Sequence, residues 1–149
     1  MIHFEGDRTF PLPVADVAAK LSDAAFLIGC LPDARVTEAT PDRGAWKLKP
    51  KFTFLTGTLD MTLTATARIP GEAVAYRVTT KAIGAGSAVE TKLAFVPTAD
   101  GGTVVRWTGD LVEVTGLLKM VPKGLIQSTA EKVIDDVWTA IGAKLAAGG

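Results

Sequence analysis

Residues 55–69, LTGTLDMTLTATARI, decide the fold because apolar or small residues alternate with polar ones throughout the stretch. Leucine, glycine, methionine, alanine and isoleucine occupy the odd positions, and the even positions are mostly threonine. Successive side chains of a β-strand point to opposite faces of the sheet. The stretch therefore predicts one long strand within 52–69, with the odd positions facing a buried side and the even positions facing water.

Shorter stretches of the same period predict six further strands, separated by turn residues such as Pro70-Gly71 and Asp100-Gly101-Gly102. These strands are expected near residues 3–10, 34–40, 45–49, 74–81, 89–95 and 105–111. Between the first two strands, residues 14–21 and 24–28 predict two short helices, and Ser22-Asp23 is placed to cap the second one.

The period changes near the C-terminus, where apolar residues recur every three or four positions. They are Ile126, Ala130, Val133, Ile134, Val137, Ile141 and Leu145. Polar residues such as Gln127 and Glu131 fall mostly on the other side. This pattern predicts an amphipathic helix from Pro122 or Leu125 to about Ala146. At a rise of about 1.5 Å per residue it would be ~33–37 Å long, enough to cross a whole sheet.

These elements together predict a single α+β domain over residues 1–149. Consecutive antiparallel strands with one wet face bury the other face against a helix. We therefore expect a seven-stranded curved antiparallel sheet around the long C-terminal helix, with the two short helices after the first strand. A strongly curled sheet closed over one helix leaves space between them.

The composition excludes several classes of protein. Apolar residues make up 48% of the chain and the mean hydropathy is +0.28, yet no run reaches the ~18 apolar residues of a membrane span. Sixteen basic residues balance sixteen acidic ones, which is not the charge balance of a nucleic-acid binder. The excess apolar surface must be buried or must line a cavity.

Cysteine and histidine occur once each, as Cys30 and His3. A single cysteine suits a reducing compartment, and the first ten residues do not have the apolar core of a signal peptide, so we expect a cytoplasmic protein. We expect Cys30 to be a small buried hydrophobe and His3 to be a surface residue. No catalytic residue, metal site or cofactor is predicted from this residue set.

The chain resembles the SRPBCC (START-like, helix-grip) superfamily, and within it the CoxG family of carbon monoxide dehydrogenase subunits. Short motifs in order along the whole chain carry this resemblance. They are Phe4-x-Gly6, Pro13-x-x-x-Val17, Leu21-x-Asp23, Cys30-Leu31-Pro32, Gly84-x-Gly86 and Gly102-Thr103. The sequence departs from the family at Asp33, where a glycine is usual, and it ends without the C-terminal tail of many members. The resemblance implies a cavity for a hydrophobic ligand and service to a molybdenum hydroxylase, a partner redox enzyme, at the membrane.

The expected cavity is an apolar pocket of roughly 300–1,000 Å³ between the sheet and the long helix. On the sheet side, we expect it to be lined by Leu59, Met61, Leu63, Trp107 and Leu111, and on the helix side by Ile126, Ala130, Val133 and Val137. Glu113 continues the inward register of Leu111, so it is either a carboxylate on the apolar wall or a residue at the rim in water. Trp46, Trp107 and Trp138 either clasp a flat ligand or belong to the core.

Residues 115–124 are the expected door of this cavity, because Gly116, Pro122 and Gly124 weaken local structure. Leu118 and Met120 would meet the ligand, while Lys119 and Lys123 touch acidic lipid headgroups in a transient membrane-surface contact. The alternative is a plain loop that leads into the helix, with both apolar residues in the core.

Two functions from different classes follow. The first is a protein that binds or carries a lipid- or quinone-like molecule. The second is an enzyme of the cyclase or hydratase kind, which needs at least two polar groups converging inside the cavity, where the sequence offers only Glu113. An assembly factor acting through its surface is a third option.

Overall fold

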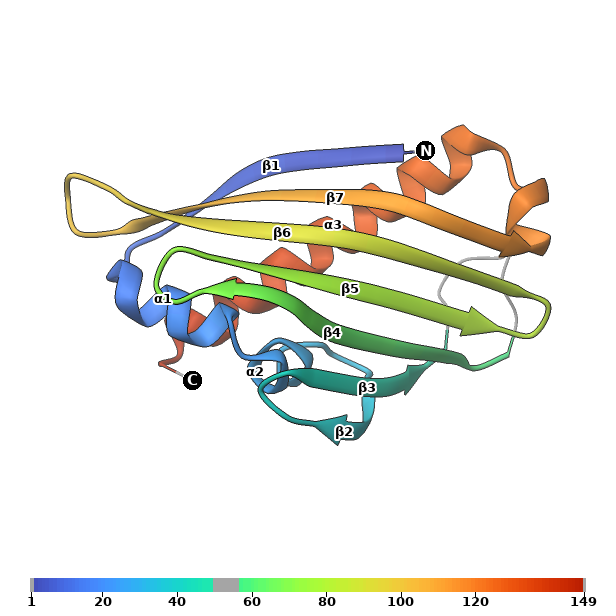
Figure 1. Cartoon of the computed structure of the whole chain (residues 1–149), viewed down its shortest axis with the longest axis horizontal. Coiled ribbons are helices and arrows are strands. Elements are labelled where there is room, and N and C mark those ends of the chain that lie inside the picture. The colour runs from blue at the N-terminus through green and yellow to red at the C-terminus, as the bar shows by residue number, and fades with distance from the viewer. Residues whose placement is uncertain (1, 50–56, 149) are drawn as a thin grey trace.

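The computed structural model describes residues 2–49 and 57–148, which form one seven-stranded sheet and three α-helices (Figure 1). The strands follow the order β1-β7-β6-β5-β4-β3-β2, and all six pairings are antiparallel. The strands are β1 (Ile2–Phe10), β2 (Arg35–Ala39), β3 (Arg43–Leu48), β4 (Leu59–Ile69), β5 (Ala73–Ala82), β6 (Ala85–Pro97) and β7 (Thr103–Gly116). The helices are α1 (Val14–Leu21), α2 (Ala24–Gly29), the short 3-10 helix η1 (Leu117–Met120) and α3 (Lys123–Ala146).

The predicted architecture is confirmed: a curved antiparallel sheet packs on one long C-terminal helix, and two short helices follow the first strand. Two details differ from the expectation. Strand β4 begins at Leu59, and residues 52–56 of the expected strand lie outside the described residues. Strand β7 runs on to Gly116, so that η1 occupies the space that the sequence left to a loop.

A β-bulge at Thr66 breaks the alternation that the sequence shows in β4. Ala65 pairs with Tyr76 and Ala67 pairs with Ala75, which leaves Thr66 as the extra residue. Beyond it, Arg68 lies opposite the buried Val74. The prediction that every odd position of 55–69 faces inward is therefore wrong after the bulge, because one extra residue exchanges the two faces.

Because Arg68 faces inward, its side chain connects β4 to the segments around the short helices. Its Nε atom donates a hydrogen bond of 3.0 Å to the carbonyl oxygen of Ser22, and its guanidinium also binds the carboxylate of Asp42. Helix α2 starts as the sequence predicts, because the Asp23 side chain accepts a hydrogen bond of 3.0 Å from the backbone N–H of Ala25. The ends of α1 and α2 are thus fixed to the sheet.

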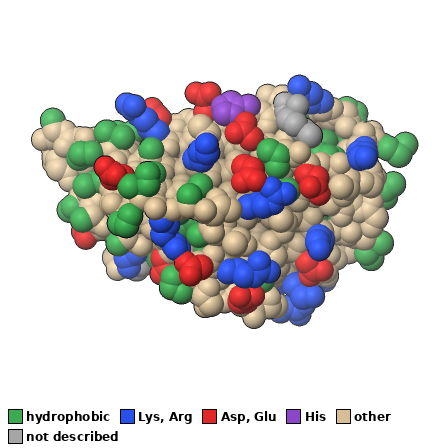
Figure 2. Space-filling view, in the orientation of Figure 1, with side chains coloured by type: hydrophobic (Ala, Val, Ile, Leu, Met, Phe, Trp, Pro, Cys, Tyr) green, Lys and Arg blue, Asp and Glu red, His purple; other side chains and the backbone are tan. Residues whose placement is uncertain are grey.

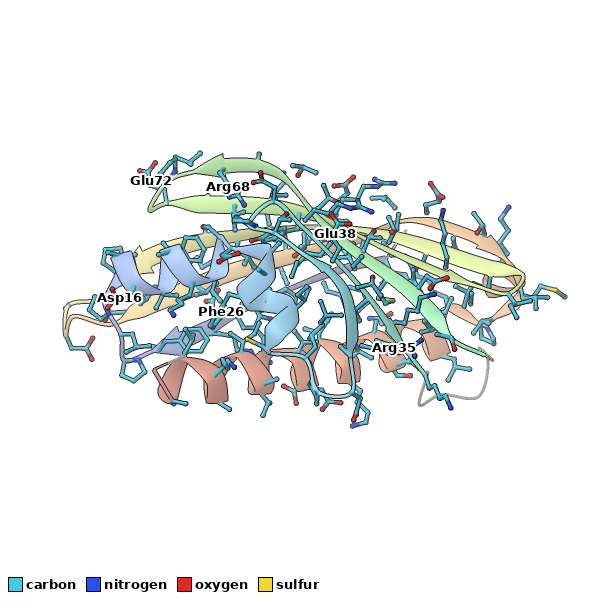
Figure 3. All side chains as sticks on the ribbon, turned by 90° about the horizontal axis from the view of Figure 1, so that it is seen from below. Asp16, Phe26, Arg35, Glu38, Arg68 and Glu72 are labelled. Carbon is cyan, nitrogen blue, oxygen red and sulfur yellow. The ribbon has the colours of Figure 1, made fainter. Side chains whose placement is uncertain are left out.

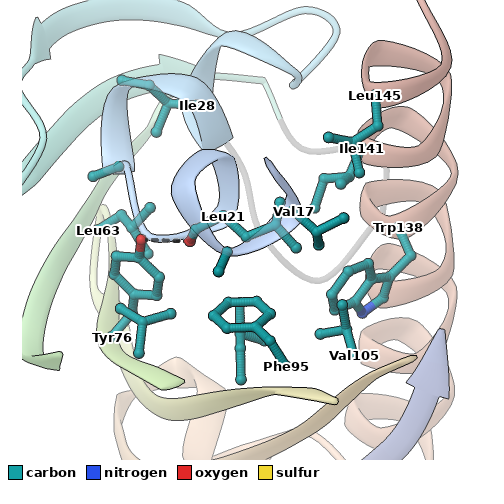
Figure 4. Close-up of a cluster of buried hydrophobic side chains, with 14 of the residues drawn as sticks. Val17, Leu21, Ile28, Leu63, Tyr76, Phe95, Val105, Trp138, Ile141 and Leu145 are labelled. Carbon is teal, nitrogen blue, oxygen red and sulfur yellow. Dashed lines mark hydrogen bonds between the residues drawn. The ribbon is translucent and has the colours of Figure 1, made fainter. Parts of the chain in front are cut away.

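The main core lies where α1 and α2 stand between the sheet and the second half of α3 (Figure 3). Val17 and Leu21 of α1 are fully buried among side chains of the sheet and of α3 (Figure 4). The ring centroids of Phe10 and Trp138 are 6.2 Å apart, and those of Trp107 and Trp138 are 6.3 Å apart. All three tryptophans take part in this cluster, Trp46 and Trp138 as buried members and Trp107 packed against them. The second half of α3 therefore rests on a continuous apolar layer.

One polar interaction crosses this core. The hydroxyl of Tyr76, a buried residue of β5, donates a hydrogen bond of 2.7 Å to the carbonyl oxygen of Leu21 at the end of α1 (Figure 4). The last carbonyls of a helix have no partner within the helix, so this bond satisfies one of them in a place that water does not reach. Burial raises the pKa of Tyr76, and the nearby Arg68 opposes that rise.

The variant Tyr76→Phe tests this bond. It leaves the Leu21 carbonyl buried without a partner, so we expect the free energy of unfolding at neutral pH to fall by about 1–3 kcal/mol in urea denaturation. Because the native state holds the phenolic proton more tightly than the unfolded chain, the difference should shrink as pH rises above about 10, by at most about 1.4 kcal/mol per pH unit. A difference that stays constant across that range would show that the hydroxyl does not titrate as we infer.

Candidate functional site

The inner face of the sheet, which we define as the face directed at α3, is apolar over β4 and β7. Leu59, Leu63 and Leu111 are buried, and Met61 and Trp107 are half-buried. All five sheet residues that the sequence placed on the cavity wall therefore lie on the inner face. Two residues of this face, Val78 and Val89, were not among those predicted to line the cavity. They share one row across the sheet with Leu63 and Leu111, and both are half-buried. These residues form a continuous apolar wall.

The first half of α3 is less buried against this wall than the second half. The buried residues of α3 are Trp138, Ile141 and Leu145, all in its second half. Among the described residues, no residue of α3 before Ile134 belongs to either buried apolar cluster. Ile126 and Ala130 are half-buried and Val133 is 46% exposed, whereas Val137 packs against the main core. The apolar side chains in the first half of α3 are therefore packed less densely than those in the second half.

In the first half of α3, polar residues occupy the side of the helix that is buried in the second half. Positions seven apart lie on nearly the same side of an α-helix. Glu131 is seven residues before Trp138, Gln127 is seven before Ile134, and both polar residues are exposed. The sequence pattern had grouped Gln127 and Glu131 with the outer side of the helix. The first half of α3 thus carries two exposed polar side chains on the line that buried residues occupy in the second half.

Glu113 lies on the outer face of the sheet, so its expected inward register is wrong. Strand β7 contains an extra residue at Val112, because Val89 pairs with Leu111 while its neighbour Ala88 pairs with Glu113. The bulge turns Glu113 outward, where its carboxylate lies 3.8 Å from the guanidinium of Arg77 and its side chain is more than half exposed. The carboxylate on which the enzyme hypothesis depended is therefore not on the apolar wall.

The inner face also carries polar groups that the sequence pattern did not single out. Thr80 and Ser87 pair across β5 and β6 in the register of the inward residues, and both are half-buried. The indole Nε1 atoms of Trp46 and Trp107 are buried without a hydrogen-bond partner in the part of the chain that the structure describes. A buried N–H without an acceptor costs about 1–3 kcal/mol. An oxygen acceptor on a bound molecule would remove that cost.

At Gly109 of β7, the inner face of the sheet can accommodate an added Cβ atom. It is buried and continues the inward register of Trp107, and a Cβ atom placed on it would have the Cγ1 atom of Val89, at 3.9 Å, as its nearest neighbour. By contrast, a Cβ atom on Gly6 would lie 2.9 Å from the ring of Trp107. The space in front of Gly109 can take a side chain, while the backbone at Gly6 is in direct contact with the indole.

Two hollows lie on the outer face of the sheet. The larger, of about 680 Å³, crosses β1, β7, β6, β5 and β4 and is lined by small residues such as Ala75 and Ala94 between Arg106 and Lys92. The smaller, of about 320 Å³, lies over Arg77 and Glu113. Figure 2 shows acidic and basic side chains interspersed over this face. The outer hollows are open grooves on a charged surface, and the predicted apolar pocket between sheet and helix stays a prediction.

Within the expected door, residues 115–124, Leu118 and Met120 lie in different surroundings. Leu118 is 7% exposed and forms a small second cluster with Leu59, which Val114 and Val121 adjoin. Met120 is 81% exposed and points away from it. Leu118 therefore belongs to the core, whereas Met120 lies in water, and the role of the segment as a door stays a prediction.

The single histidine and cysteine behave as surface and packing residues. His3 lies between Asp110 and Glu5, and its hydrogen bonds to Asp110 first and Glu5 second raise its pKa. The thiol of Cys30 donates to the carbonyl oxygen of Phe26 at 3.2 Å, and burial raises its pKa. The described residues contain no group of three or more acidic, histidine or cysteine side chains arranged to hold a metal ion. None of the helices in the described part has the length and apolar character needed to cross a bilayer.

Comparison with solved structures agrees with this architecture. A conserved protein from Geobacillus kaustophilus superimposes with a TM-score of 0.83 at 19% identity, over 97% of this chain and 95% of that one. A START superfamily protein from Mycobacterium smegmatis superimposes with a TM-score of 0.69 at 11% identity, over 99% of both chains. At these identities the likeness shows the fold alone, which is the START-like helix-grip fold.

The sequence comparisons identify the family. Comparison with curated proteins finds no match. The model of the CoxG family of carbon monoxide dehydrogenase subunits matches residues 6–146, nearly the whole chain. Apart from the start of Phe4-x-Gly6, the motifs that carry the resemblance fall within that span. The chain therefore belongs to the carbon monoxide dehydrogenase CoxG family.

Proposed function

We propose that this protein binds and carries a hydrophobic small molecule in the space between the inner face of the sheet and the first half of α3. The observation that carries the proposal is incomplete burial there: Met61, Val78 and Val89 of the inner face are only half-buried, and so are Ile126 and Ala130 in the first half of α3. Membership of the CoxG family and the START-like fold support a role in binding hydrophobic ligands. An apolar wall that the protein does not cover with its own side chains is a surface for a ligand.

The polar groups at the border narrow the class of ligand. The apolar wall of β4 and β7 favours a hydrocarbon body, whereas the hydroxyls of Thr80 and Ser87 favour oxygen acceptors at one end. A lipid- or quinone-like molecule combines both features. We therefore propose a ligand of that kind, with its body on Leu63, Val78 and Leu111.

The carrier proposal predicts that the purified protein retains apolar molecules. Organic extraction of the protein followed by mass spectrometry should release a compound with a long hydrocarbon part, and the stripped protein should bind a fluorescent fatty-acid analogue. The same extraction after treatment with an apolar resin is the control, because a surface contaminant would be removed by the resin. A protein that yields no such compound and binds no apolar probe would rule the proposal out.

The location of the site is tested with Gly109→Leu. The new side chain would occupy the space in front of Gly109, so we expect the affinity for the fluorescent fatty-acid analogue to fall by roughly tenfold or more. Thr108→Leu is the matched control, because the neighbouring side chain lies on the outer face, where it borders the larger hollow. Equal affinities in the wild type and Gly109→Leu, measured by fluorescence titration, would place the ligand elsewhere.

We also propose that the carrier works in the cytoplasm and serves a redox enzyme of the carbon monoxide dehydrogenase type, as the name of the family suggests. A molybdenum hydroxylase of this type from the same organism should then co-elute with the protein on size-exclusion chromatography, or should take an apolar electron carrier from it. An enzyme whose reduction of an apolar quinone is unaffected by the loaded protein would speak against this partner.

A further inference from the structure

The charges on the outer face of the sheet are mixed locally but divided unequally between two parts of the face. The first part consists of β1, β7 and β6, whose outward side chains include five carboxylates and two basic groups. The carboxylates are Glu5, Asp7, Glu90, Asp110 and Glu113, and the basic groups are Lys92 and Arg106. We call this part the acidic half. His3 lies within it and offsets at most one negative charge.

The second part consists of β5, β4, β3 and β2 and has the reverse composition. Its outward side chains include five basic groups and two carboxylates. The basic groups are Arg35, Arg43, Lys47, Arg77 and Lys81, and the carboxylates are Glu38 and Asp60. We call this part the basic half. The two halves have opposite excess charge, although the chain as a whole is neutral. In Figure 2, acidic side chains gather around the histidine at the upper edge, and basic ones gather toward the lower right.

The two halves meet between β6 and β5. There Arg77 of the basic half forms ion pairs with Glu90 and Glu113 of the acidic half, so the boundary is already neutralised within one copy. Away from the boundary, Arg35, Lys47 and Lys81 lie in one row across the sheet, in which Asp60 is the one carboxylate. The positive excess therefore lies toward the β2 edge, and the negative excess lies toward the β1 edge.

Short side chains line the middle of the outer face. Ala75 and Thr79 of β5 face outward there, together with Ala88 of β6 and Thr62 of β4. Such residues leave room for a second sheet at the usual spacing of about 10 Å. Seven strands about 4.8 Å apart, with a rise of about 3.3 Å per residue, present a face of roughly 800 Å². A standard protein interface buries about 800 Å² on each partner, so the face is large enough for one.

We propose that two copies of this chain associate through their outer faces, with the acidic half of each copy on the basic half of the other. A twofold axis between the faces, perpendicular to the line that joins the two halves, produces this arrangement. Arrangements that bring like halves together are repelled, so the charges select one orientation.

A second copy fits this face better than a partner of uniform charge. An acidic partner surface would be repelled by the acidic half, and a basic one by the basic half. A second copy carries the matching pattern by symmetry. Helix α3 lies on the other side of the sheet, so the association leaves it free and does not depend on the ligand that we propose.

The association is tested by sedimentation velocity over a range of protein concentrations. We expect a dimer at an ionic strength of about 0.05 M, with a dissociation constant that rises at least tenfold at about 0.5 M, because salt screens exposed charges. A protein that stays monomeric at the lower ionic strength up to about 0.5 mM would overturn the proposal.

A charge exchange between the two halves tests the arrangement itself. Arg35→Glu with Lys81→Glu makes both halves negative, and Glu5→Lys with Asp7→Lys makes both halves positive. All four side chains are exposed, so the folds should be retained, which circular dichroism checks. We expect each double variant alone to lose at least tenfold in dimer affinity, because like charges then face each other. An equimolar mixture of the two should form a dimer again.

The matched control is Lys132→Glu with Lys144→Glu, which reverses the same number of charges on exposed residues of α3. This variant should dimerise like the wild type. A dimer that neither outer-face variant weakens, or that the α3 variant weakens equally, would show that another surface makes the contact. A mixture of the two outer-face variants that stays monomeric would contradict the pairing of acidic with basic halves.

Discussion

The position of α1 between the sheet and α3 is the constraint on which the rest of the structure depends. Leu21 and Val17 fill the core, and the hydrogen bond from Tyr76 to the Leu21 carbonyl holds the end of α1 against β5. The second half of α3 rests on this layer and buries Trp138, while the first half has no such layer beneath it. Packing against α3 is therefore dense at one end and looser at the other, where we propose that the ligand binds.

Two β-bulges determine which side chains border that interior. The extra residue at Thr66 turns Arg68 inward, where it binds the end of α1 through the Ser22 carbonyl. The extra residue at Val112 has the opposite consequence, because it turns Glu113 out to Arg77. One bulge thus places a charge where it supports the core, and the other removes a charge from the apolar wall.

The two ends of the molecule differ in how densely they are packed. The end with α1 and the chain's main core is closed and supplies stability. The end with η1 carries exposed apolar side chains, and the hydrogen bond between Leu117 and Gly84 holds it in place. The carrier that we propose needs a densely packed end that keeps the fold intact when the site is empty. It also needs an end through which an apolar ligand can enter.

The sequence by itself determined the order of the elements, the antiparallel sheet and the apolar wall of Leu59, Leu63 and Leu111, because alternation with a period of two or of about 3.6 residues is a local property of the chain. It did not determine where that alternation changes face. Apolar residues continue through the bulge to Ile69, which lies in water, and the apolar positions of α3 continue past the point where packing ends, so Val133 is exposed. Register shifts and packing distances depend on hydrogen bonds and contacts between segments far apart in the chain, so only the tertiary structure decided them.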